Sequence, residues 1–252
     1  MSTRDEFPAA WAAVTGVEGW LTEAQARRLW DAAARLPSGS QAVEIGSYRG
    51  RSAIVLAKAA GDGVRVAAID PHAGNDRGPL EIHGRPEVGE GDHEVFVRNL
   101  ATAGVGGIVR HVRLPSASAA AHGAVEGEVQ LLYIDGAHRF APALDDIRTW
   151  GDRVAPGGTM LIHDSFNAVG VTAAQVRALV LGRRFRYAGR SGSMSEYRRE
   201  DLAPAARAAN AGRQLLQLGY FAQSVAIKVA LVARQGWLAR LLGHRSGTDW
   251  PY

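Results

Sequence analysis

The segment Gln41-Ala-Val-Glu-Ile-Gly-Ser-Tyr-Arg-Gly-Arg-Ser52 predicts a short strand, a turn with two glycines and the start of a helix. In this order, the backbone N–H groups at the start of the helix can contact a ligand. Gly46 and Gly50 allow that ligand to approach the backbone closely. Ser47 and Tyr48 follow Gly46, so the turn lacks the G-x-G-x-x-G spacing of dinucleotide-binding proteins. It also lacks the GxxxxGK[ST] phosphate loop of ATPases.

Strand-like and helical patterns alternate on both sides of this segment. The alternation predicts a doubly wound α/β fold with a mostly parallel sheet. The predicted strands are residues 41–45, 64–70, 108–113, 129–135 and 159–164, the last introduced by Gly157-Gly158, followed by a closing hairpin of residues 185–189 and 194–198. The predicted helices are residues 23–36, which a Thr22–Gln25 capping box begins, and residues 51–60, 93–102, 142–152 and 172–181, with a short Ala-rich helix before residue 129.

Residues 71–92 have no hydrophobic periodicity and are rich in Gly, Pro and charged residues. They predict a long loop, of the kind that is usually functional or mobile in a compact domain. Asp92 is expected to cap the helix that begins at His93.

The chain has 252 residues, of which 46% are hydrophobic, and it contains no cysteine. This length fits one α/β domain or two small ones. The lack of cysteine excludes a disulfide scaffold, a cysteine-ligated zinc site and thiol catalysis. The first residues do not resemble a signal peptide, and no run of 18 uncharged apolar residues predicts a membrane-spanning helix. We therefore expect a cytoplasmic protein.

The C-terminal part of the chain is basic, with 12 basic and 4 acidic residues from Arg183 onward. Residues 202–243 have a helical pattern and predict one or two appended helices. The chain therefore divides into an N-terminal helical cap (1–40), an α/β domain (41–200) and a basic helical extension (201–252). The extension can pack on the domain or on a second copy of the chain, which is the commoner arrangement. Alternatively, it can lie on the anionic inner face of a membrane through Trp237 and neighbouring apolar residues. No aromatic–basic motif predicts nucleic-acid binding.

Acidic residues end three of the predicted strands, at Asp70, Asp135 and Asp164. The carboxyl ends of parallel strands meet in one crevice, where Asp70 is suited to accept the hydroxyl hydrogens of a ribose. Two further carboxylates there are costly to bury unless a cation or a hydrogen-bond donor compensates them. His138 follows Asp135 by three residues, and a neutral imidazole can remove a proton from an alcohol near pH 7.

These residues resemble a known family. Residues 43–52 are similar to motif I of the class I S-adenosylmethionine-dependent methyltransferases, and Ala68-Ile-Asp-Pro-His72 is similar to their motif II. The block Ile134-Asp-Gly-Ala-His-Arg-Phe140, followed by Gly157-Gly158 and His163-Asp164, resembles one branch of the family. That branch contains O-methyltransferases of antibiotic and macrolide sugars and proteins labelled cephalosporin hydroxylase-like. The resemblance covers about residues 20–200 and implies a Rossmann-like sheet of seven strands with a reversed final strand.

The resemblance also implies the residues of the site. The implied S-adenosylmethionine-binding residues are Glu44, Gly46, Ser47, Tyr48, Gly50, Ser52, Asp70, Pro71, His72, Ser116 and Asp135. His138 is implied as the general base, with Asp135 as its catalytic partner. Asp135, Asp164 and His163 match the positions that bind Mg²⁺ in metal-dependent members. Because histidine is a poorer ligand for Mg²⁺ than a carboxylate, the sequence leaves the metal undecided.

The expected function is O-methylation of a small-molecule hydroxyl, on a sugar or on a glycosylated or polyketide-type metabolite. Three alternatives remain. A nicotinamide-dependent oxidoreductase could share the fold, although the glycine spacing argues against it. A non-catalytic, cofactor-binding member could dock through its basic extension. An iron-dependent oxygenase would need His138, Asp135 and His163 as its ligands, and the methyl-donor pocket makes it the least favoured.

Overall fold

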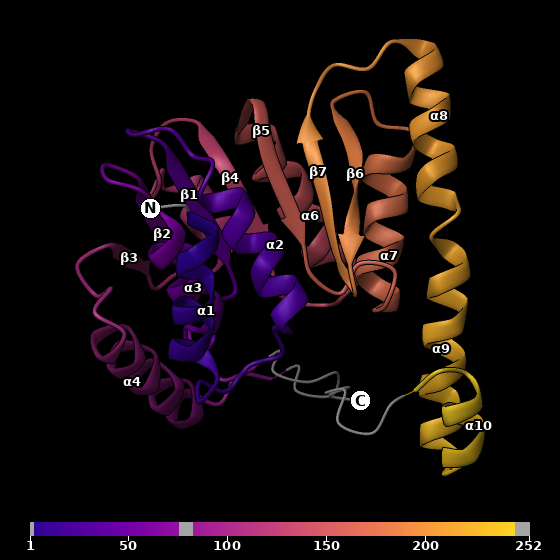
Figure 1. Cartoon of the computed structure of the whole chain (residues 1–252), viewed down its shortest axis with the longest axis horizontal. Helices are drawn as coiled ribbons and strands as arrows, with labels where there is room; N and C mark the ends of the chain where they lie inside the picture. Colours follow the sequence, from indigo (N-terminus) through magenta and orange to yellow (C-terminus); the bar gives the residue numbers. More distant parts are fainter. Residues whose placement is uncertain (1–2, 76–82, 245–252) are drawn as a thin grey trace.

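The computed structural model describes residues 3–75 and 83–244, and its centre is a seven-stranded sheet (Figure 1). The strands are β1 (Gln41–Ile45), β2 (Arg65–Ile69), β3 (Val109–Val112), β4 (Val129–Ile134), β5 (Val154–Ile162), β6 (Phe185–Ser191) and β7 (Met194–Arg199). They lie in the order β3-β2-β1-β4-β5-β7-β6. The first five strands are parallel, while β7 runs antiparallel to β5 and to β6. The predicted doubly wound sheet and its closing hairpin are therefore confirmed.

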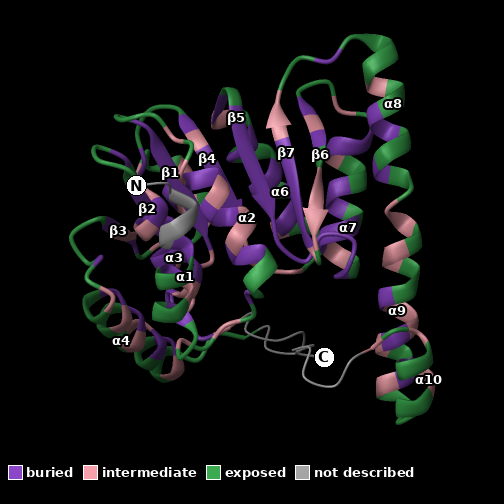
Figure 2. Cartoon of the chain, in the orientation of Figure 1, coloured by how far each residue is buried: buried purple, intermediate pink, exposed green. Residues whose placement is uncertain are grey.

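Helices cover both faces of this sheet. They are α1 (Thr3–Val14), α2 (Glu23–Ala33), α3 (Arg51–Ala59), α4 (Pro86–Thr102), α5 (Ser116–Ala121), α6 (Phe140–Thr149), α7 (Val169–Gln175), α8 (Pro204–Leu215), α9 (Leu218–Val232) and α10 (Gly236–Leu241). Side chains along a strand alternate between the two faces, so Leu131 and Tyr133 of β4 join the core under α1–α4. Leu132 and Ile134 join the second core, under α5–α7. The central strands β1 and β4 are thus buried on both faces, while β6 at the edge of the sheet is partly exposed (Figure 2).

Several predicted boundaries were wrong. Helix α4 begins at Pro86 rather than at His93, so the predicted loop 71–92 ends seven residues early, and residues 76–82 lie outside the described part of the chain. Proline suits the first helical turn because that turn needs no backbone N–H donor. Asp92 lies inside α4 and accepts a hydrogen bond from Nε of Arg49 at 2.9 Å instead of capping the helix. Gly157-Gly158 do not introduce β5 but lie within it, where the register against β4 shifts.

The N-terminal cap contains two helices, of which the sequence pattern predicted only the second. The capping box of α2 is confirmed, because the Thr22 N–H donates to Oε1 of Gln25 at 2.8 Å and the Gln25 N–H donates back to the Thr22 hydroxyl. Helix α1 precedes it and packs Phe7 edge-on against Trp30. The Arg51 side chain joins the cap to α3, since it lies over the Trp11 ring and donates to the Gly19 carbonyl.

Up to residue 244, where the described part of the chain ends, the C-terminal extension forms three helices rather than the one or two that were predicted. Helix α8 packs on β6, where the Asn210 side chain accepts from the Tyr187 N–H and donates to the Phe185 carbonyl. Helices α9 and α10 pack mainly on each other. The helical stretch Pro204–Val232 is long and apolar enough to cross a membrane by length and composition, and 17% of its most apolar window is buried. The prediction that the chain holds no such helix was therefore too strict, although one helix of this kind is weak evidence for a membrane span.

Candidate active site

A cavity of about 610 Å³ lies at the carboxyl ends of β1, β2, β4 and β5. This volume is typical of sites for small ligands and cofactors. Twelve of the predicted site residues line it: Gly46, Ser47, Tyr48, Ser52, Asp70, Pro71, His72, Ser116, Asp135, His138, His163 and Asp164. Parallel strands end at the same edge of a sheet, which is why residues so far apart in the sequence meet here. Glu44 and Gly50, also predicted to bind the cofactor, lie outside this lining.

The turn after β1 lies directly against the backbone that follows β4. Gly46 has a φ of +83°, and its N–H donates to the Ile69 carbonyl at 2.9 Å. A Cβ atom on Gly46 would lie 2.1 Å from the Asp135 carbonyl oxygen. Only glycine satisfies both the backbone angle and the contact. The turn after β1 and the backbone after β4 therefore lie closer together than any residue other than glycine at position 46 would allow.

Asp70 joins the turns that follow β1 and β2. Its Oδ2 accepts the N–H groups of Ser47 at 2.9 Å and Tyr48 at 2.8 Å, and its Oδ1 accepts the His72 N–H at 2.8 Å. These bonds stabilise two unusual backbone angles, since Tyr48 and His72 both have a φ of +45°. Each carboxylate oxygen has more than one lone pair, so Asp70 can still accept hydrogen bonds from a ligand.

Glu44 lies behind this turn and is fully buried. Within the described part of the chain, neither of its carboxyl oxygens has a hydrogen-bond partner. Burial, with smaller contributions from the carboxylates of Asp135 and Asp70, raises the pKa of Glu44 to about 8, although the nearby hydroxyls of Ser52 and Ser47 act to lower it. Glu44 is therefore protonated at neutral pH, so it adds no negative charge beneath the cavity.

Two aspartates and two histidines form a compact group at the ends of β4 and β5. Nδ1 of His163 lies 3.2 Å from Oδ1 of Asp135 and 3.7 Å from Oδ2 of Asp164. Nε2 of His138 lies 3.2 Å from the same Asp164 oxygen and 3.8 Å from the same Asp135 oxygen. Each imidazole thus faces both carboxylates.

This arrangement shifts the pKa of all four groups. Burial alone would raise the pKa of Asp135 and Asp164, but the facing imidazoles, His163 above all, hold both pKa values well below the usual range. Burial alone would lower the pKa of His163 and His138, but the two carboxylates raise both pKa values above the usual range for histidine. The imidazoles therefore compensate the buried Asp164 carboxylate and the half-buried Asp135 carboxylate.

The group does not fit a Mg²⁺ ion. Among residues 3–75 and 83–244, no cluster of three or more His, Asp and Glu side chains is arranged to hold a metal. Tyr133 donates to Oδ2 of Asp135 and Asn167 donates to Oδ1 of Asp164, both at 2.9 Å, while the other two carboxylate oxygens face imidazoles. Mg²⁺ needs an octahedron of oxygen ligands, and these four oxygens already have partners.

The structure adds lining residues that sequence reasoning missed. Asp146 of α6 lines the cavity and accepts a hydrogen bond from the Ser116 hydroxyl at 2.5 Å, and burial raises its pKa to about 6. Trp20, from the N-terminal cap, stacks on the Tyr48 ring at 5.4 Å. Tyr220, from α9, completes the wall. Helical periodicity could place Asp146 on the buried face of α6, but nothing local in the sequence indicates that Trp20 or Tyr220 reaches the cavity.

Comparison with known proteins agrees with this geometry. Residues 43–165, just under half of the chain, match the family model described as a methyltransferase domain. The structure is similar to that of an O-methyltransferase from Bacillus cereus in complex with SAH, with a TM-score of 0.50 and 14% identity over 79% of this chain and 91% of that one. It is also similar to cofactor-bound Rv0187 from MTB, with a TM-score of 0.50 and 18% identity over 78% of this chain and 87% of that one.

The two likenesses establish the fold, and the family model assigns the chemistry of the domain. The chain carries a methyltransferase domain on the Rossmann-like fold of the class I S-adenosylmethionine-dependent methyltransferases. The prediction of this class from the motifs at residues 43–52 and 134–164 is confirmed. The match favours a methyltransferase over a nicotinamide-dependent oxidoreductase.

Proposed function

We propose that the cavity binds S-adenosylmethionine and that the enzyme transfers its methyl group to a hydroxyl oxygen of a small-molecule acceptor. The observation that carries this proposal is that one cavity brings together the turn at Gly46, the Asp70 carboxylate and the Asp135–His138–His163–Asp164 group. The turn at Gly46 and the Asp70 carboxylate can bind a nucleoside that carries a charged tail. The group of two aspartates and two histidines can remove a proton from an acceptor hydroxyl.

The described contacts suggest how the donor is held. The backbone around Gly46 and Ser47 contacts its methionine part, and Asp70 accepts the two ribose hydroxyls. Ser116 and Asp146 lie beside the adenine, where a carboxylate can accept a hydrogen bond from the exocyclic amine. S-adenosylmethionine supplies a sulfonium methyl group, and the chain's own residues orient it.

The acceptor is a sugar or a glycosylated or polyketide-type metabolite. The family resemblance suggests this class, and the stacked pair Trp20 and Tyr48 supports it. Both aromatic side chains line the cavity and present an apolar surface for a sugar ring or a flat polyketide ring. Arg139 and Asn167, in the same wall, offer hydrogen-bond donors for acceptor oxygens.

The chemical step is an in-line displacement. The acceptor oxygen attacks the sulfonium methyl carbon, the new O–CH₃ bond forms as the S–CH₃ bond breaks, and the sulfur leaves as a neutral thioether. The hydroxyl proton passes to the His138 imidazole. Asp135 and Asp164 stabilise the resulting imidazolium and fix the orientation of the ring. Positive charge moves from sulfur to the imidazole, so orientation supplies most of the rate enhancement.

The sequence left a Mg²⁺ ion undecided, and the donor set does not fit one. We therefore expect a metal-independent reaction in which His163 supplies the compensating positive charge. Turnover measured with EDTA should equal turnover measured with added Mg²⁺. A loss of activity in the chelator that Mg²⁺ restores would contradict this.

The proposed function is tested by calorimetric titration with S-adenosylmethionine, followed by mass spectrometry of a panel of hydroxyl acceptors. We expect saturable donor binding, no binding of NADH, and a product that gains one methyl group on oxygen. Absence of donor binding at millimolar concentration would overturn the proposal. Donor binding without any methylated product from the panel would favour the non-catalytic alternative.

Asp146 offers a more specific test of donor binding. We expect Asp146→Asn to weaken S-adenosylmethionine binding about tenfold, because an amide accepts a hydrogen bond less strongly than a carboxylate. The pKa of about 6 adds a pH dependence: donor affinity should rise as the pH increases through 6 in the wild type and stay flat in the variant. Asp145→Asn, at the exposed neighbouring position, is the matched control: it should keep the wild-type donor affinity at neutral pH, and its rise in affinity should move to lower pH because the Asp145 carboxylate helps to raise the pKa of Asp146. Equal affinities for Asp146→Asn and wild type would remove Asp146 from the adenine site.

A further inference from the structure

The end of the C-terminal extension carries several exposed apolar side chains that are close together in the sequence. We use the name arm tip for Val229, Val232, Arg234, Trp237, Arg240 and Leu241. The exposed fractions of its apolar members are 62% for Val229, 80% for Val232, 64% for Trp237 and 76% for Leu241. Four large apolar side chains that are mostly exposed within thirteen residues indicate an interaction surface rather than scattered surface hydrophobics.

Contacts between α9 and α10 hold the arm tip together. Ile227 and Ala230 of α9 pack with Ala239 of α10 in a small third core, and the Gln223 side chain donates to the Leu242 carbonyl at 2.8 Å. Figure 1 shows the lower part of α9 and the whole of α10 extending past the ends of β6 and β7. Figure 2 shows that most residues of α9 and α10 are exposed or half-buried. The described part of the chain thus presents the surface without covering it.

The charge around this surface has one sign. The chain has 25 acidic residues, yet none lies between Asp201 and Asp249. The same interval contains six basic residues: Arg207, Arg213, Lys228, Arg234, Arg240 and Arg245. Arg234 and Arg240 are exposed and flank Trp237 in the sequence. An apolar patch with a tryptophan, bordered by arginines and lacking carboxylates, has the chemistry of a membrane-interface helix.

We propose that the arm tip docks on the surface of an anionic lipid bilayer. Trp237, Leu241 and the two valines enter the boundary between headgroups and acyl chains, and Arg234 and Arg240 bind lipid phosphates. A second copy of the chain fits less well. A twofold interface would place two arginine-rich, acid-free surfaces against each other with no carboxylate between Asp201 and Asp249 to neutralise them.

The docking surface shares a helix with the active site. Tyr220 of α9 lines the cavity, and Nζ of Lys228 donates to the Asn167 carbonyl at 3.2 Å. In the docked enzyme, α9 would therefore contact the lipid through its C-terminal end and line the cavity through Tyr220. The docking proposal does not depend on methyl transfer, because its observations concern exposure and charge alone.

The experiment is co-sedimentation of the full chain with vesicles. One set contains phosphatidylglycerol and phosphatidylcholine in equal parts, and the other contains phosphatidylcholine alone. We expect binding to the anionic vesicles, at least about tenfold weaker binding to the neutral ones, and release as salt is raised. Arg234→Gln with Arg240→Gln should weaken binding by more than about tenfold, and Trp237→Ser with Leu241→Ser should abolish it.

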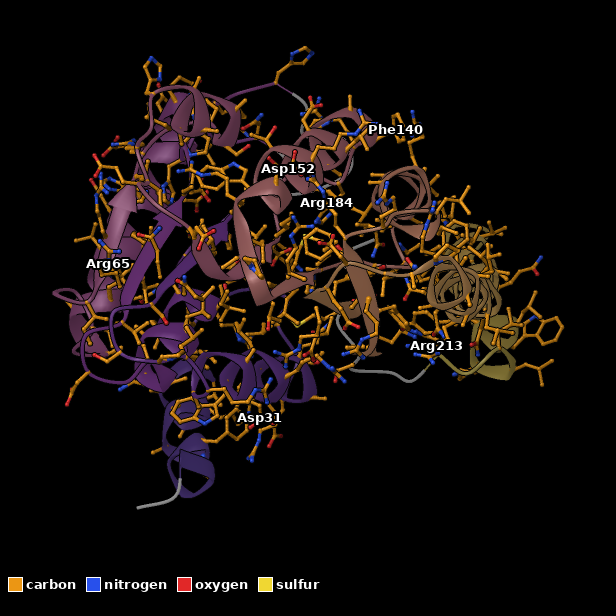
Figure 3. All side chains as sticks on the ribbon, turned by 90° about the horizontal axis from the view of Figure 1, so that it is seen from above. Asp31, Arg65, Phe140, Asp152, Arg184 and Arg213 are labelled. Carbon is orange, nitrogen blue, oxygen red and sulfur yellow. The ribbon has the colours of Figure 1, made fainter. Side chains whose placement is uncertain are left out.

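Controls come from the opposite side of the molecule. Arg65 lies far from the C-terminal helices in Figure 3, and Val97 of α4 is 50% exposed. Arg65→Gln and Val97→Ser should leave vesicle binding unchanged, and all variants should keep the wild-type unfolding temperature and donor affinity. The proposal is overturned if the wild type does not bind anionic vesicles, or if the arm-tip variants bind like wild type. It is also overturned if light scattering finds a dimer that Trp237→Ser with Leu241→Ser dissociates.

Discussion

Replacing His138 with glutamine is expected to lower kcat by about 10²- to 10⁴-fold and to leave the dissociation constant of the methyl donor within about twofold of wild type. The imidazole takes the hydroxyl proton in the transition state, whereas the donor is held by the turns after β1 and β2. Glutamine keeps a polar side chain of similar length but cannot accept the proton. Steady-state turnover assays measure kcat, and calorimetry on the same preparation measures the dissociation constant of the methyl donor.

The pH profile adds an independent readout. A general base acts in its unprotonated form, so kcat/KM should rise with pH through the pKa of His138. Asp135 and Asp164 raise that pKa, which places the rise above pH 6.5. Asp135→Asn removes one carboxylate and should move the rise to lower pH. His122→Gln, at an exposed position of the same residue type, is the control. A His138→Gln enzyme with normal kcat would show that another group takes the proton.

Gly46→Ala is expected to cost at least about 3 kcal/mol of folding stability and to abolish donor binding. The φ of +83° is unfavourable for alanine, and the added methyl would lie 2.1 Å from the Asp135 carbonyl oxygen and 2.6 Å from its carbon. Because these are backbone atoms, no side-chain rotation can relieve the contact. The turn after β1 must move away from β4, which disrupts both halves of the cavity.

Gly39→Ala separates the two causes. Gly39 has nearly the same φ, +82°, but a Cβ there would have no atom within 4 Å. This variant should lose only the backbone contribution, about 1 kcal/mol, and should bind the donor normally. Urea unfolding of the three proteins measures the difference. Equal losses for Gly46→Ala and Gly39→Ala would show that the contact with Asp135 does not constrain the site.

The sequence predicted the sheet well because each strand carries its own signal. Buried parallel strands such as residues 41–45 and 129–134 are short apolar runs bounded by turns, so they can be found without knowing their neighbours. The start of α4 could not be found in this way, since its first two turns contain Pro86, Gly89 and Gly91, which also fit a loop. The separate helix α1 was missed because Pro8 interrupts its pattern.

The site residues likewise divide into those that a local sequence signal predicts and those that depend on tertiary packing. Asp70 and Asp135 come directly after β2 and β4, while Asp164 and His138 lie two and four residues beyond a strand end, and parallel strands end at the same edge of the sheet. Trp20 and Tyr220 reach the cavity only through the packing of the cap and of α9, which depends on contacts between distant parts of the chain. The pairing of each imidazole with both carboxylates also required coordinates, because a distance of 3.2 Å cannot be deduced from spacing.

Three residues of the cavity wall, Tyr48, His72 and Asp164, hold positive φ angles of 45°, 45° and 52°. Glycine would adopt each of these angles without cost, so the chain gives up roughly 1–3 kcal/mol at every such position to keep a side chain there. Heat resistance and turnover consequently oppose each other at these three positions. A library of variants selected only for survival at high temperature would accumulate glycine in the cavity wall and lose the side chains that bind and orient the reactants.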